Sequence, residues 1–133
     1  MKIIDLKART VAIPLNCQLR HNTGVHPGYF LRTVIEIVTD EGIVGWGESH
    51  HARSPGSIGH LIDTTLKGFV VGMDATDTVG IWARIYKFQL GSHGMGAATA
   101  IAMSGIDQAL WDIKGKALGC PVLQVLGGLS RAK

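Results

Sequence analysis

Part-way along the chain the residue pattern changes from a two-residue to a helical repeat, and this change limits the fold more than any other feature. From Ile4 to Ala12 apolar and charged residues alternate, as in a strand with one buried face. Residues 29–39 and 43–48 are rich in Val, Ile and Thr, and Asp40-Glu41-Gly42 between them suits a tight turn. These segments predict a three-stranded antiparallel meander, with Ile4, Leu6, Ala8 and Ala12 on one side of its first strand.

Three helices are predicted after these strands. The first enters at Ser54-Pro55 and carries apolar residues at helical spacing from Ile58 to Phe69. Thr76 or Asp77 caps the second helix, which has one apolar stripe made of Val79, Trp82 and Tyr86. Strands followed by helices are typical of an α+β domain.

The third predicted helix is the longest, and it runs from about Ala97 to Leu118. Gly119 and Pro121 end it in the order expected for a helix C-terminus. An apolar stripe lies beside a row of small residues, which lets a neighbouring backbone come close. The stripe is Met103, Ile106, Leu110, Ile113 and Ala117, and the row is Ala98, Ala102, Gly105 and Ala109.

Length and composition exclude several classes of protein. The 133 residues are too few for a complete eight-stranded α/β barrel, which needs roughly 200 residues or more. With 46% hydrophobic and 17% charged residues, the chain is expected to have a packed core rather than to be disordered. A net charge of +3, scattered along the chain, does not predict nucleic-acid binding. Since no signal peptide or long apolar stretch is found, we expect a cytoplasmic protein without membrane contact, with Cys17 and Cys120 as thiols.

Glycine and carboxylate patterns do not by themselves indicate a catalytic site. Residues 42–48 lack the GxGxxG spacing and lie within a strand, so their glycines indicate tight packing. Asp107 and Asp112 are five residues apart and do not share a helix face, whereas Asp112 and Lys116 form an ordinary i,i+4 ion pair. The sequence contains no recognisable nucleophile–base set and no carboxylate trio for a metal ion.

Polar loops contain the candidate site residues. All but one of the six histidines fall in three predicted loops, residues 16–28, 50–55 and 91–96. They are either separate surface residues or parts of one ligand-facing edge, because loops often contain binding residues. The candidate substrate-binding residues are His21, Asn22, His26, Tyr29, His50, His51, Ser92 and His93.

The segment Ser104–Gly119, with Pro121 and residues 126–128 after it, resembles the end of a known domain. That domain is the N-terminal capping domain of the mandelate racemase/muconate lactonizing enzyme group in the enolase superfamily. Arg32-Thr33, Thr39–Gly42 and Gly45–Glu48 match the second and third strands of this group. The resemblance covers nearly the whole chain. It implies a capping domain over residues 1–128, with residues 129–133 starting the linker to a barrel domain that this chain lacks.

The resemblance also implies that the catalytic groups belong to the barrel domain. In such enzymes the barrel supplies three carboxylates for magnesium and the Lys or His bases that remove the proton next to a substrate carboxylate. The metal stabilises the enolate that forms. All these groups would lie beyond Lys133, so we expect no catalytic residue and no metal ligand in this chain, which should be inactive alone. The expected partners are the missing barrel domain or chain and other copies in a homo-oligomer.

Residues 22–33 are similar to the glucarate dehydratases, which also have an Asn, a Gly-X-His and a Tyr before an Arg-Thr pair. This similarity implies that loops 16–28 and 50–55 close over the barrel mouth and contact a sugar acid. The expected parent is therefore an acid-sugar dehydratase, a lyase of carbohydrate-acid metabolism. A racemase or cycloisomerase of the same superfamily, and a stand-alone non-catalytic binding module, remain alternatives.

Overall fold

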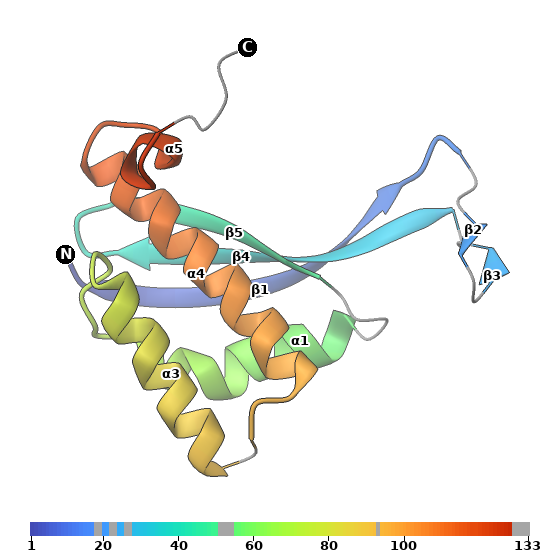
Figure 1. Ribbon diagram of the computed structural model, residues 1–133, viewed down its shortest axis with the longest axis horizontal. Helices are drawn as coiled ribbons and strands as arrows, with labels where there is room; N and C mark the ends of the chain where they lie inside the picture. The colour runs from blue at the N-terminus through green and yellow to red at the C-terminus, as the bar shows by residue number, and fades with distance from the viewer. Residues whose placement is uncertain (18–19, 22–23, 26–27, 51–54, 93, 129–133) are drawn as a thin grey trace.

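A three-stranded antiparallel sheet and a layer of helices on one of its faces make up the fold (Figure 1). The computed structural model describes residues 1–17, 20–21, 24–25, 28–50, 55–92 and 94–128. The sheet has the order β1-β4-β5, with β1 at Ile3–Pro14, β4 at Tyr29–Thr39 and β5 at Val44–His50. The predicted meander is confirmed, and Gly42 has the positive φ of 80° that its turn requires. A short hairpin, β2 (Arg20–His21) with β3 (Gly24–Val25), was not predicted.

One predicted feature of β1 is wrong. Ile4 was expected on the buried side with Leu6, but its side chain is 55% exposed, whereas Ile3 is 1% exposed. The pairing of β1 with β4 shifts register between Ile3 and Asp5. This irregularity inserts a residue into the alternation, so Ile3 and Leu6 both face the core.

The helical layer begins with one continuous helical stretch. It comprises α1 (Pro55–Leu61), a π-helical turn η1 (Ile62–Leu66) and α2 (Lys67–Val70). Ile58, Ile62 and Leu66 are buried as predicted, while Ser54 lies outside the described residues. Two longer helices follow, α3 (Thr78–Ser92) and α4 (Ala97–Ala117), and the unpredicted short helix α5 (Val122–Val125) comes last.

Helix α3 presents a different face to the core from the one expected. Asp77 caps it, since the Gly80 N–H donates to Asp77 Oδ1 over 2.9 Å. The predicted stripe is exposed, by 76% at Val79, 41% at Trp82 and 44% at Tyr86. The buried face is Thr78, Ile81, Ile85 and Gln89. Because α3 has large apolar side chains on both faces, its periodicity alone could not select the inner one.

Helix α4 packs closely against β5. A Cβ atom added to Gly45 or Gly47 would collide with the backbone of Ala109 or Gly105 in α4. The predicted row of small residues thus packs where expected, except that Ala98 at its start is exposed. The predicted apolar stripe is buried from Met103 to Ile113, and Ala117 beyond it is exposed.

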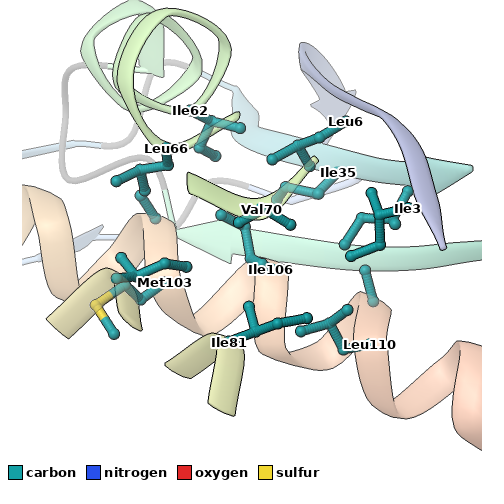
Figure 2. Packing of buried hydrophobic residues seen from close by; sticks show 14 of the residues in the cluster. Ile3, Leu6, Ile35, Ile62, Leu66, Val70, Ile81, Met103, Ile106 and Leu110 are labelled. Atoms are coloured by element: carbon teal, nitrogen blue, oxygen red, sulfur yellow. The ribbon is translucent and has the colours of Figure 1, made fainter. Parts of the chain in front are cut away.

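The core fills the space between the sheet and the helices (Figure 2). Leu6 and Ile35 reach into it from the sheet, Leu66 from η1, and Ile106 from α4. Each of these side chains is almost completely removed from solvent. Burying a side chain of this size stabilises the fold by about 1.5–3 kcal/mol, so this one cluster holds the helices on the sheet.

An acidic side chain ties the sheet to α2 and makes stability depend on pH. Hydrogen bonds from Lys67, over 2.6 Å, and from Lys7 lower the pKa of Asp5 from 3.8 to about 2. A carboxyl whose pKa is lower in the folded state stabilises the fold above its unfolded pKa. The free energy of unfolding should therefore fall as the pH drops from about 4 to about 2. Urea titrations across this range should show a weaker fall in Asp5→Asn, and an equal fall in both proteins would contradict this assignment.

Candidate functional site

Two strands of the sheet continue beyond the helices and carry the region of the sequence that contains half of the candidate residues (Figure 1). His50, the last residue of β5, pairs with Arg32 of β4, so residues 29–31 of β4 pair with β1 alone. We call the described residues between positions 12 and 31 the arm, namely 12–17, 20–21, 24–25 and 28–31. The hairpin β2–β3 lies at its far end (Figure 1). An edge of the domain that projects in this way can reach a ligand held outside the domain.

Tyr29 and His50 are the candidate residues whose side chains are described in and beside the arm. Tyr29 begins β4 opposite Pro14 and is 42% exposed. His50 was expected in a loop, but the structure places it in β5, where it is exposed. Its pairing with Arg32 puts it about three residues, or roughly 10 Å along β4, from Tyr29.

The other candidate residues are less fully placed. His21 lies in β2, where its backbone pairs with Gly24. Ser92 was predicted in a loop with His93, but it belongs to the last turn of α3 and donates its hydroxyl hydrogen to the Phe88 carbonyl over 2.9 Å. The end of α3 lies far from the β2–β3 hairpin in Figure 1, so the structure does not bring Ser92 to the arm. The remaining candidates lie outside the described residues: Asn22, His26, His51 and His93.

Arg32 is at the centre of a polar cluster where the arm leaves the sheet. Its Nε donates to Glu48 Oε1 over 2.8 Å, and its Nη1 donates to the Leu31 carbonyl over 3.1 Å. The guanidinium also lies 4.9 Å from the centre of the Phe30 ring. Glu48 in turn donates its backbone N–H to Gln108 of α4 over 3.2 Å. The root of the arm is therefore connected to α4 through β5.

Side chains of α4 also cover the outer edge of β5, an arrangement that sequence reasoning missed. The Trp46 N–H donates to Asp112 Oδ2 over 2.9 Å, and Lys116 Nζ donates to the Val44 carbonyl over 2.7 Å. Together with the hydrogen bond from the Glu48 N–H to Gln108, these contacts form what we call the edge ladder. Three polar residues spaced four apart on a helix were the available signal. The predicted ion pair of Asp112 with Lys116 is confirmed at 2.6 Å.

Beside the edge ladder, a cleft of about 660 Å³ opens between β5, α4 and α5. Trp46 and Trp111 line it with Val122 and Leu126, and both Trp46 and Leu126 are at least half exposed. Asp107 also faces the cleft, and its partial burial raises the pKa of its carboxyl group. This cleft is chiefly an apolar surface rather than a set of converging catalytic groups.

Two further properties of the described residues bear on function. No three of their His, Cys, Asp and Glu side chains are grouped so that they could hold a metal ion, so they do not fit magnesium. Among the helices described, none has the length and hydrophobicity that crossing a bilayer requires.

Comparisons with known proteins identify the family. Residues 23–127 match the model of the mandelate racemase/muconate lactonizing enzyme N-terminal domain. A D-galactonate dehydratase from Xanthomonas axonopodis pv. citri is 47% identical over 100 residues, which are 73% of this chain and 25% of that protein. The chain thus spans about a quarter of the length of such curated relatives.

Solved structures agree with this match. A member of the enolase superfamily from Polaromonas sp. JS666 has a TM-score of 0.89 and 44% identity, and the match covers 98% of this chain and 34% of that one. The muconate lactonizing enzyme from Pseudomonas fluorescens has a TM-score of 0.85 and 28% identity, over 98% of this chain and 35% of that one. The α+β fold, the matched family model and these structures lead to one conclusion: the chain belongs to the mandelate racemase/muconate lactonizing enzyme family and carries its N-terminal domain.

Proposed function

We propose that this chain is the substrate-facing domain of a cytoplasmic, magnesium-dependent acid-sugar dehydratase. The observation that carries the proposal is the 47% identity to a D-galactonate dehydratase, which extends over 73% of the chain. In that reaction a base removes the proton next to the substrate carboxylate, and the hydroxyl group on the next carbon leaves as water. Magnesium would stabilise the enolate. Since the described residues do not fit the metal, its ligands and the base are proposed to lie in a second domain.

The arm supports a role in substrate selection. It projects beyond the helical layer and has Tyr29 on it and His50 beside its root. Side chains at such an edge can close over a neighbouring active site, exclude water and hydrogen-bond to the hydroxyl groups of a sugar acid. We assign this role to His21, Asn22, His26, Tyr29, His50 and His51, whereas Ser92 lies at the end of α3, apart from the arm.

The proposed partner is a barrel domain, and the apolar cleft is where we expect it to pack. Trp46, Trp111 and Leu126 would lose exposed apolar surface to it, and α5 at the cleft wall is the last helix of the described chain. We extend the proposal to a homo-oligomer, because Val79, Trp82 and Tyr86 leave a second apolar face exposed on α3.

A chimera tests the proposed function. Residues 1–128 would replace the corresponding quarter of the Xanthomonas axonopodis D-galactonate dehydratase, and the unchanged relative would be the positive control. We expect the chimera to convert an acid sugar into a 2-keto-3-deoxy acid, while the 133-residue chain alone shows no turnover. A chimera that unfolds cooperatively but dehydrates none of a panel of acid sugars would contradict the proposal. Exchange of the proton next to the carboxylate without loss of water would favour a racemase or cycloisomerase instead.

Within this chimera, His26→Ala tests the proposed role of the loop at residues 16–28. Removing one neutral hydrogen bond to the substrate should lower kcat/KM about threefold to tenfold. His60→Ala is the matched control, because His60 is exposed on α1 and is not one of the candidate site residues. If the two variants have equal kcat/KM values on the best substrate, His26 does not contribute to specificity.

A further inference from the structure

The place where the arm joins the sheet depends on a small number of contacts. Residues 33–38 of β4 have a strand on each side, whereas residues 29–31 have only β1 beside them. Arg32 pairs with the last residue of β5 and is therefore the final position of β4 with a partner on both sides. A two-stranded ribbon is at best marginally stable by itself in water. The direction of the arm must therefore be set by contacts at its root.

Arg32 makes those contacts on the face of the sheet that the helices leave open. Thr33 and Ile35 face the core, so Arg32 and Val34 point to the opposite side. Only 23% of the Arg32 side chain is exposed, although it carries a full positive charge. One edge of its guanidinium bonds Glu48 of β5, and its plane lies close to Phe30 of the arm. The Arg32 side chain thus connects β5 of the sheet to Phe30 of the arm.

Glu48, the partner of Arg32 in β5, is held in place by contacts with α4. Glu48 belongs to β5, and its backbone N–H is held by Gln108 from α4. Neighbouring positions of β5 are held by the edge ladder and by the close packing of Gly47 on Gly105. Contacts therefore run from α4 through Glu48 and Arg32 to Phe30, the residue next to Tyr29.

We propose that Arg32 is a positioning residue for substrate binding: its ion pair with Glu48 and its contact with Phe30 set the angle of the arm. This inference rests on the proposed function and deepens it, since it names the residue that places Tyr29, a proposed substrate-binding residue of the arm. Arg32 itself does not touch the substrate. The effect belongs to the arm and not to the overall stability of the domain, because the pair lies outside the core.

The first test measures amide hydrogen exchange in the 133-residue chain and needs no activity. In Arg32→Ala, amides of residues 29–31 should exchange about twofold to fivefold faster, as expected for loss of a partly exposed ion pair. Amides of residues 35–38 should not change. Arg32→Lys keeps the charge for Glu48 and Phe30 and should restore most of the protection. Lys7→Ala is the matched control, because it breaks an ion pair with Asp5 on the same sheet away from the arm.

The second test uses the chimera and its best acid-sugar substrate. Arg32→Ala and Glu48→Ala should each raise KM about twofold to fivefold and leave kcat nearly unchanged, while Lys7→Ala changes neither. Unchanged exchange in the arm of Arg32→Ala would overturn the positioning role, whatever the activity. Faster exchange with an unchanged KM would overturn its link to the substrate. Faster exchange in a chimera that dehydrates no acid sugar would leave the mechanical role standing and remove the proposed function.

Discussion

Gly47→Ala, which adds a single methyl group, should strongly destabilise the domain. The added Cβ would collide with the carbonyl oxygen of Gly105 and approach the backbone nitrogen of Ala109, so α4 would have to move away from β5. Overpacking a core typically costs 1–3 kcal/mol. Because backbone atoms cannot rotate out of the way, we expect a loss of about 3 kcal/mol or more from the free energy of unfolding.

Urea unfolding followed by circular dichroism measures this loss. The midpoint should fall clearly, with a similar slope if the denatured state is unchanged. Gly68→Ala is the matched control, because Gly68 lies in helix α2 and nothing lies within 4 Å of a Cβ placed there. Alanine should stabilise that helical position by about 0.5–1 kcal/mol. Equal midpoints for the two variants would show that α4 and β5 do not approach each other this closely.

Ile3→Ala should be strongly destabilising, whereas Ile4→Ala should have little effect. Ile3 is buried in the core and Ile4 is 55% exposed, although the two residues are adjacent. Truncating a buried isoleucine to alanine costs about 2–5 kcal/mol, because it removes buried surface and leaves a cavity. A surface substitution usually changes stability by no more than about 0.5 kcal/mol.

The same chemical change at neighbouring positions makes this comparison a direct test of the register shift in β1. Thermal and urea unfolding of both variants would measure the two losses of stability. If β1 alternated regularly from Ile4 onward, the order of the two effects would be reversed. A larger loss in Ile4→Ala than in Ile3→Ala would therefore show that the strand pairs in a different register.

Local patterns were sufficient to predict the main elements of this fold. The strands at residues 29–39 and 43–48 and the turn at Gly42 follow from β-branched residues beside a glycine that tolerates positive φ. The helix-strand contact follows from Gly105 and Ala109, since small side chains four apart allow close approach. These predictions succeeded because each depends on a contact made by the residues in the pattern itself.

Other features depend on contacts between distant segments and could not be predicted in this way. The shift at Ile3 accompanies backbone hydrogen bonds with Gly72 and Met73, about 70 residues away. The buried face of α3 is determined by its packing against α4 and α2, not by the residues of α3 alone. For the candidate site, the residue types were sufficient to predict polar loops. The pairing of His50 with Arg32 and the separation of Ser92 from the arm could not be predicted, because they arise from the tertiary fold.

The edge ladder has a consequence for how this chain is made in the cell. Its contacts join residues 60, 66 and 72 positions apart, so the ribosome finishes β5 long before it makes the α4 residues that cover it. At about 5–20 residues per second, the interval lasts about 3 to 14 seconds. During this time α4 cannot shield the outer backbone groups of β5, which could pair with another nascent strand. Chaperone binding early in synthesis should therefore benefit this domain more than one whose edge strands are covered by nearby sequence.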